Sequence, residues 1–429
     1  MKKFLKIAAL LAALIECAAL ASCSNSSGSP APAAPIATTY TVSVGTFDNG
    51  TVAASKTSGV AAGETVTLTA TPKTGYELSS ITVTAADSSA VATSGSGNTR
   101  TFTMPAQNVT VTATFAVDKG AYTKIGQTEI NGTSYDIVTF GLWPQTIKAD
   151  GVTVDTSVTE PHGAFTYCKG SDGEWYVKQA EKAYGSDYKY SDGTAAGQGG
   201  TSEKWFKVEP IKWRVLATNY GGAKLLLAES ILISDLQYYL DRNSRSIGGA
   251  TIHANNYKYS TIRAWLNGSY EPDDTQATTH AGKGFLQSAF TSGQQAAIPA
   301  ATVDNSAQST TDVGGNVTSA TNYVCDDTND KIFLLSEKEV TTSAYGFAAY
   351  DAYGAGNARI RATTDFAKAT GAFQNTAAGM GGAWLLRSPY YYVGYQVGTV
   401  TSQGNVYQNH QVNTDNNNRG IAPALRVAN

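Results

Sequence analysis

The chain has 429 residues, of which 42% are hydrophobic and only 15% are charged, with a formal net charge of −3 at neutral pH. At roughly 150 residues per domain, the length allows two or three packed domains. Since its net charge is slightly negative, the chain has no excess of basic residues with which to bind nucleic acid or anionic lipid. Because the charged fraction is well below the ~25% usual for globular proteins, polar uncharged residues must cover the surface, which favours a β-rich exported protein.

The first 22 residues have the pattern of an export signal. Basic residues at Lys2, Lys3 and Lys6 precede an Ala- and Leu-rich run that ends at Leu20. This arrangement is typical of a secretory signal, and the run is too short and too rich in Ala to predict a membrane span. Glu16 departs from the pattern because it interrupts the apolar run. We therefore expect residues 1–22 to direct export.

The residues Leu20-Ala21-Ser22-Cys23 resemble a lipobox, the site cut by lipoprotein signal peptidase. The resemblance implies that Cys23 carries lipid and anchors the exported protein to the cell envelope, at the outer membrane or cell surface. An ordinary signal peptide with an incidental cysteine is the alternative. Residues 23–38 are rich in Ser, Ala, Gly and Pro and predict a flexible linker.

Residues 39–117 predict a small β module. Thr alternates with apolar residues in four segments, which is typical of strands with one buried face: 40–44, 65–70, 81–84 and 109–115. Turn residues at 48–50, 62–64 and 73–75 separate the strands. The phrases Ala62-Gly63-Glu64-Thr65-Val66 and Phe102-Thr103-Met104-Pro105 resemble the internalin-B-type B-repeat of bacterial surface proteins. The resemblance implies a β-grasp-like spacer.

Residues 118–429 predict one larger domain of the β-rich α+β class. Strand patterns occur at 136–140, 211–216, 224–228 and 331–335. A short helix is expected at 259–266, with Ser260 as its cap and Ile262, Trp265 and Leu266 on one face. Residues 285–290 and 336–340 predict further short helices or turns.

Several phrases of this domain carry a second resemblance. They include Phe140-Gly141-Leu142-Trp143-Pro144-Gln145, Pro210-Ile211-Lys212-Trp213-Arg214 and Trp384-Leu385-Leu386-Arg387-Ser388-Pro389. Together they resemble an uncharacterised domain of bacterial lipoproteins. That domain is in turn similar to the C-type-lectin-like fold of formylglycine-generating enzymes and of retroelement-diversified variable proteins. The resemblance implies a rigid frame that presents a binding face.

The segment 390–418 is the candidate binding face. It is rich in Tyr and Asn, contains no Lys or Arg, and has Asp415 as its only acid. Tyr offers a large amphipathic surface at low entropic cost, and Asn both donates and accepts hydrogen bonds. We expect Val397, Val400, Val406 and Val412 to be buried, with Trp384 and Arg387 in the frame. The candidate ligand-binding residues are Tyr390, Tyr391, Tyr392, Tyr395, Tyr407, Asn409, His410, Asn413, Asp415, Asn416 and Asn417.

Two interpretations of this segment stay open. Its residue types are products of adenine mutagenesis in Asn-type codons, so the resemblance to retroelement-diversified proteins implies a diversified face. The alternative is a polar β-turn region, in which Asn and Gly are common. Recognition by uncharged groups predicts binding that depends little on salt. The expected partners are an extracellular protein or glycan and, through the lipid, the membrane.

No motif predicts catalysis, a metal site or a cofactor. The sequence contains no HExxH, GxSxG or P-loop pattern. The four histidines lack the spacing of metal ligands and are expected at the surface: His162, His253, His280 and His410. The protein is therefore predicted not to be an enzyme. A structural envelope lipoprotein and an exported carbohydrate-active enzyme are the alternative functions.

Two smaller features remain open in the sequence. The run Asp326-Asp327-Thr328-Asn329-Asp330 concentrates oxygen ligands, but it lacks the Gly and the distal Glu of an EF-hand loop, so a solvated turn is expected. Cys168 and Cys325 could form a disulfide if their Cα atoms lie within about 7 Å.

Overall fold

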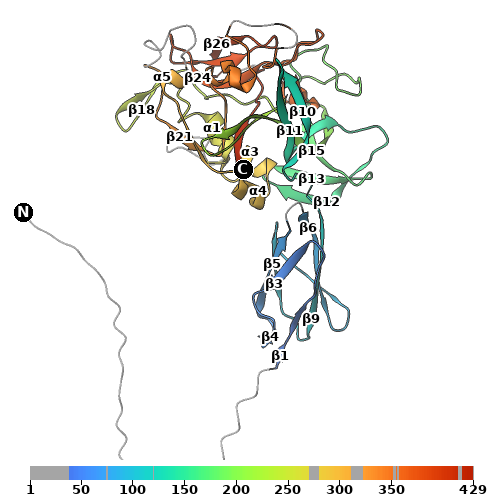
Figure 1. The fold of residues 1–429 in the computed structure, drawn as a ribbon. Coiled ribbons are helices and arrows are strands. Elements are labelled where there is room, and N and C mark those ends of the chain that lie inside the picture. The colour runs from blue at the N-terminus through green and yellow to red at the C-terminus, as the bar shows by residue number, and fades with distance from the viewer. Residues whose placement is uncertain are drawn as a thin grey trace, which may run out of the picture.

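The computed structural model of the chain describes residues 38–73, 76–118, 120–269, 280–310, 322–350, 354, 357–413 and 418–428. Strands dominate and helices are short, which confirms the predicted β-rich α+β class. Figure 1 shows a small body, made of β1–β9, beside a larger body that we call the head. The predicted export signal, Cys23 and most of the predicted linker lie outside the described residues.

The small body contains nine strands, which confirm the four segments predicted from alternation. They are β1 (Thr39–Tyr40), β2 (Val42–Val44), β3 (Gly50–Ala54), β4 (Val60–Ala61), β5 (Thr65–Pro72), β6 (Tyr76–Ala85), β7 (Ala90–Val91), β8 (Thr99–Thr103) and β9 (Val109–Val117). The strands form sheets of order β2-β9-β6-β7 and β3-β5-β8, and β1 pairs with β4. Val66, Leu68 and Val111 are fully buried between them, while most threonines stay at least partly exposed.

A nine-stranded sheet organises the head. Its strands are β10 (Thr123–Ile130), β11 (Thr133–Ile147), β12 (Val154–His162), β13 (Phe165–Gly170), β14 (Trp175–Ala180), β15 (Glu203–Tyr220), β16 (Ala223–Ala228), β22 (Ile332–Phe333) and β27 (Ala424–Ala428). The order is β12-β13-β14-β15-β16-β27-β22, with β11 also on β15 and β10 on β11. The sheet thus joins the first hundred residues of the head to its last strand.

Aromatic side chains fill the core beneath this sheet. Trp143 is buried, and its ring contacts those of Phe165, Trp265, Phe285 and Phe366. Its indole Nε1 donates to the carbonyl oxygen of Leu232 at 3.0 Å, so the buried donor is satisfied.

Gly141 enables the close approach of β11 to this core. The register of β11 on β15 shifts between Thr139 and Leu142, and Gly141 adopts a φ of +72° there. A Cβ at Gly141 would lie 2.4 Å from the Phe290 ring and 2.8 Å from the carbonyl oxygen of Ala289. Both the backbone conformation and the contact therefore require glycine.

Short helices and strands complete the head. They are β17 (Ser230–Ile231), β18 (Arg245–Ile247), β19 (Ala250–Ile252), α1 (Thr261–Asn267), α3 (Phe285–Ala289), α4 (Ser292–Ala297), β20 (Ala301–Val303), α5 (Ala307–Thr310), β21 (Thr328–Asp330), η2 (Glu339–Thr341), η3 (Ser343–Tyr345), β23 (Ala362–Thr363) and α7 (Asp365–Ala369). The predicted cap is confirmed, because Ser260 Oγ accepts a hydrogen bond from Arg263 N at 3.2 Å. Gly268 ends α1 in the left-handed conformation.

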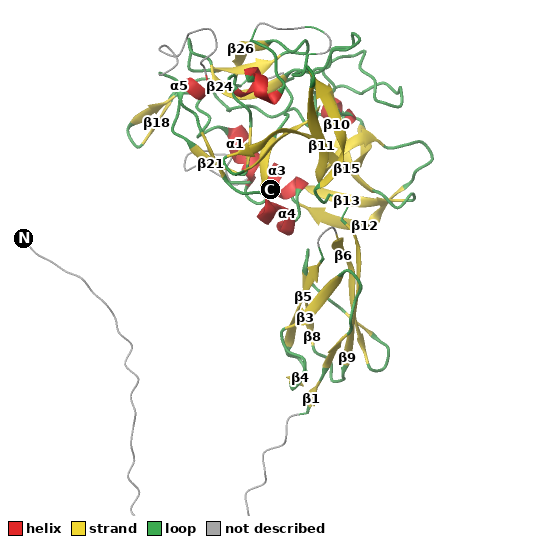
Figure 2. Ribbon diagram, in the orientation of Figure 1, coloured by secondary structure: helices red, strands yellow, loops and turns green. Residues whose placement is uncertain are grey.

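A separate three-stranded sheet carries the candidate binding segment. It contains β24 (Trp384–Pro389), β25 (Gln396–Val400) and β26 (Val406–Gln411), in that order. The four valines predicted to be buried are at most 4% exposed. Figures 1 and 2 show this sheet at the end of the head farthest from the small body.

Candidate ligand-binding face

Three consecutive tyrosines at the turn between β24 and β25 pack their rings on one another. The ring centroids of Tyr390 and Tyr391 lie 4.9 Å apart and those of Tyr391 and Tyr392 lie 5.9 Å apart, both edge-to-face. Such pairs contribute about 0.5–1.5 kcal/mol beyond the burial of their area. Tyr392 is nevertheless 72% exposed, and Tyr407 on β26 is 50% exposed. We call these four side chains the tyrosine face.

The tyrosine face consists of phenol rings and includes no acidic or basic side chain. Partial burial, followed by the neighbouring Tyr391 and Tyr392 hydroxyls, raises the pKa of Tyr390 above its ordinary value of 10.0. Burial and then the carboxylate of Glu337 raise the pKa of the neighbouring Tyr350 to about 12. These phenols therefore keep their protons and offer hydroxyl groups that both donate and accept.

A segment far away in the sequence holds the tyrosine turn in place. Asn255 Nδ2 donates to the carbonyl oxygens of Val393 and Gln396, both at 3.0 Å, and Asn255 N donates to that of Gly394 at 2.9 Å. The ring of His253 lies against Gly394, where a Cβ would be 2.6 Å from Nδ1. Sequence reasoning missed both supporting residues, since nothing in the sequence links 253–255 to a turn about 140 residues later.

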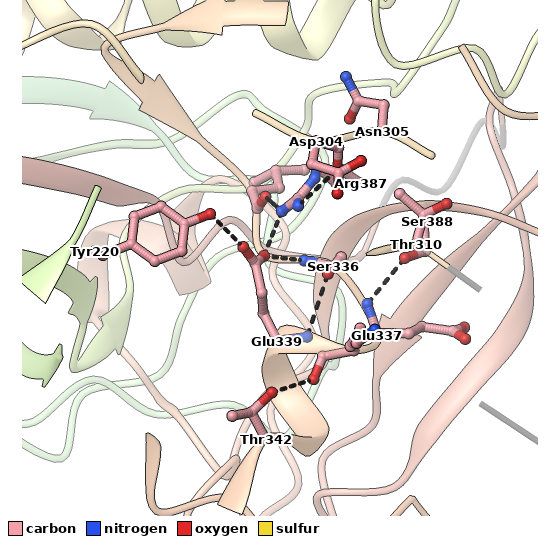
Figure 3. A network of polar contacts seen from close by, with 12 residues as sticks. Tyr220, Asp304, Asn305, Thr310, Ser336, Glu337, Glu339, Thr342, Arg387 and Ser388 are labelled. Atoms are coloured by element: carbon pink, nitrogen blue, oxygen red, sulfur yellow. Dashed lines mark hydrogen bonds and ion pairs between the residues drawn. The ribbon is translucent and has the colours of Figure 1, made fainter. Parts of the chain in front are cut away.

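A buried ion pair joins β24 of this sheet to η2 (Figure 3). Arg387 Nη1 donates to the Glu339 carboxylate and to the carbonyl oxygen of Leu334 at 2.8 Å. Glu339 also accepts from Tyr220 Oη at 2.9 Å and from Ser336 N at 2.8 Å. Burial favours a raised pKa for Glu339, but the charge and hydrogen bonds of Arg387 outweigh it and hold the pKa below its ordinary value. The predicted frame residue Arg387 is thus a fully buried, paired cation.

The structure gathers some of the predicted site residues and separates others. Tyr392 and Tyr407 are exposed and Tyr390 and Tyr391 are half-buried, with the rings of Tyr390, Tyr391 and Tyr392 in contact. The ring of Tyr395 packs partly buried against the core. Tyr395 therefore supports the turn and does not belong to its exposed surface. His410 and Asn413 are half-buried, and Asn409 lies within β26. Asp415, Asn416 and Asn417 lie outside the described residues.

The Asp-rich run and the histidines differ from expectation. Asp330 is 2% exposed in β21 and pairs with Arg263 Nε at 2.8 Å, so the run ends in a buried ion pair and the prediction of a solvated turn was wrong there. The four histidines are half-buried, not exposed. Among the described residues, no group of three or more His, Cys, Asp or Glu is arranged to hold a metal ion.

Both cysteines of the head are free thiols, so the disulfide left open by the sequence is not formed. Burial raises the pKa of Cys325 to about 11. We expect the native protein to alkylate slowly at Cys325 near neutral pH, because only the thiolate reacts. Peptide mapping after iodoacetamide treatment without reductant checks this. In denaturant, both Cys168 and Cys325 should be labelled; a bridged pair would stay unlabelled.

The fold and the tyrosine face define a protein with a small β body and a head that ends in an uncharged aromatic surface. Two parts of the chain match known families. Residues 40–119 match the divergent InlB B-repeat domain, which confirms the predicted B-repeat, and residues 221–429 match a domain of unknown function, DUF6273. No curated protein and no solved structure matches the chain. Within the described ranges, no helix is long and apolar enough to cross a bilayer.

Proposed function

We propose that this protein is an exported, lipid-anchored binding protein that recognises an extracellular protein or glycan through the tyrosine face. One observation carries the proposal: a cluster of uncharged tyrosine rings, one of them 72% exposed, lies on a hydrogen-bonded turn at the end of the head far from the small body. Exposed tyrosines on a rigid frame are typical of recognition surfaces. The role is binding, without catalysis.

In the same proposal, the rest of the chain anchors the head and holds the tyrosine face away from the membrane. In this proposal Cys23 carries the lipid, residues 24–38 form the tether, and the B-repeat is a spacer that keeps the head away from the membrane. The head is a variant of the C-type-lectin-like fold, and residues 390–418 are diversified. Sequencing the gene neighbourhood tests diversification. A near-identical second copy of the 390–418 coding stretch, differing mainly at adenines beside a reverse transcriptase gene, is the expected result; its absence leaves a binding protein of fixed specificity.

Tyr392→Ala is expected to weaken ligand binding by about thirtyfold, since truncating a central interface aromatic costs about 2 kcal/mol or more. Binding of the fluorescently labelled chain to an array of surface glycans and proteins measures this. Tyr184→Ala is the matched control, because Tyr184 is 45% exposed but contacts Phe373, outside the tyrosine face. Affinity should change little between low and high salt. Equal binding by both variants, or a steep loss of affinity with salt, would contradict the proposal.

A further inference from the structure

A small cavity lies on the head in the segment between the two family matches. It has a volume of about 160 Å³ and forms where the end of β11, the turn at 190–194 and the start of β15 meet. No residue of the tyrosine face lines the cavity, whose lining residues all lie between 147 and 205. At about 30 Å³ per water molecule, it has room for about five waters, which is the space of one pyranose ring.

A single buried carboxylate fixes two walls of this cavity. Asp365 Oδ1 accepts from Ser191 N at 2.9 Å, and its Oδ2 accepts from Ile147 N at 3.2 Å and from Ser191 Oγ at 2.5 Å. Asp365 is 5% exposed at the first turn of α7. Because one side chain ties the turn at 190–194 to the end of β11, the cavity walls are held in place without a ligand.

The lining combines an aromatic ring with polar groups of both signs. Trp205 is half-buried, and the Lys178 ammonium lies over its indole ring, 6.0 Å from the centroid. Asp150, Asp192 and Glu203 supply carboxylates, of which Glu203 pairs with Lys178. Lys148 and Lys204 supply ammonium groups, and that of Lys148 donates to the carbonyl oxygens of Ala149 and Val152 at 3.1 and 2.8 Å. Asp192 Oδ1 accepts from Thr194 N and Oγ1 at 2.8 and 2.7 Å, while its Oδ2 accepts no hydrogen bond from the described residues. The lining residues therefore combine acceptor and donor groups with an aromatic ring.

This combination selects for a neutral polyhydroxylated ligand. A free anion would meet the carboxylates of the lining, and a free cation would meet the ammonium group of Lys204. A sugar hydroxyl both donates and accepts, so neighbouring hydroxyls are satisfied by a carboxylate and an ammonium group side by side. The C–H face of a pyranose ring is apolar and can cover the exposed part of an indole ring. We propose that this cavity binds one neutral pyranose residue, with Trp205 beneath the ring and Asp192 and Lys204 on its hydroxyls.

Saturation-transfer NMR on the full chain tests this second site. The probes are methyl β-galactopyranoside, methyl α-mannopyranoside and N-acetylglucosamine, with glucuronate as an anionic comparison. We expect transfer to the ring protons of at least one neutral sugar and a weaker signal for glucuronate. Trp205→Leu should raise the Kd for the sugar by about tenfold. Asp192→Asn should also raise this Kd.

The controls separate this site from a folding defect and from the tyrosine face. Trp175→Leu is the matched control, because Trp175 is also half-buried and lies on the neighbouring β14 outside the cavity. Trp205→Leu should still weaken sugar binding in the Tyr392→Ala background, where the tyrosine face no longer contributes to the signal. If none of the neutral sugars shows transfer, if glucuronate binds as well as they do, or if Trp205→Leu and Trp175→Leu behave alike, the sugar site is refuted while the tyrosine face is untouched.

Discussion

Replacing Arg387 by Met is expected to lower the free energy of unfolding of the head by about 3–5 kcal/mol, because it leaves Glu339 as an unpaired charge in the core. The side chain of Arg387 is fully buried and that of Glu339 is 10% exposed, so water cannot replace the lost partner. Urea unfolding followed by tryptophan fluorescence measures the change. All six tryptophans lie in the head, so the signal reports on that body alone.

Two further variants identify the buried pair as the cause. Adding Glu339→Gln to Arg387→Met should recover part of the loss, because the unpaired charge is then removed. Lys182→Met breaks an exposed pair with Asp235, in which both side chains are about half exposed, and should cost about 1 kcal/mol or less. If Arg387→Met unfolds at the same urea concentration as Lys182→Met, the ion pair does not stabilise the head.

The effect of Arg387→Met should also depend on pH. The pKa of Glu339 is lower in the folded protein than its ordinary value of 4.5, so its ion pair stabilises the head fully above that value. This contribution is lost as the pH falls through the folded pKa. In the variant, Glu339 is neutral once it is protonated, so no unpaired charge then destabilises the core. The difference in stability between wild type and variant should therefore shrink below about pH 4.5.

The spacing of apolar residues and the capping residue predicted the strands and the helix that depend mainly on neighbouring residues in the chain. The strands of the small body follow from alternation of Thr with apolar residues, since each strand has one face on a core. Helix α1 follows from the Ser260 cap and from the spacing of Ile262, Trp265 and Leu266. The four valines predicted to be buried are also in the core, although Val397 and Val400 are three residues apart and a register shift lies between Val397 and Thr399.

Long-range contacts determine what the sequence could not predict. Strand β12 is almost entirely exposed and shows no apolar alternation, so no signal marks it. Asp330 looked like part of a solvated turn because its partner Arg263 is 67 residues away in the sequence. Tyr395 looked equivalent to its tyrosine neighbours, yet only the packed core distinguishes a supporting ring from an exposed one. The Tyr and Asn content of residues 390–418 predicted a recognition surface. Tertiary contacts decide which of these tyrosines are exposed to solvent.

Residues 221–429, expressed alone, are expected not to fold cooperatively although they span the matched domain of unknown function. Strand β16 is flanked by β15 and β27, so the truncated chain exposes its β15 side as an unpaired edge. The core also loses Trp143, Phe206 and Trp213, all at most 1% exposed. Losing a buried Phe or Trp costs about 3–5 kcal/mol each, so the three together approach the whole stability of a domain, about 5–15 kcal/mol.

Thermal melting by circular dichroism and amide NMR dispersion measure the outcome of this truncation. Residues 120–429 should melt in one sharp transition and show dispersed amide signals, because that fragment keeps the whole nine-stranded sheet. Residues 221–429 should show a broad melt and narrow dispersion. A sharp melt of the shorter fragment would mean that β10–β15 are an addition to an autonomous domain. The expected result places the start of the folded domain near Gly120. Phe285 and Phe366 pack against the ring of Trp143, which lies in the part that the shorter fragment lacks.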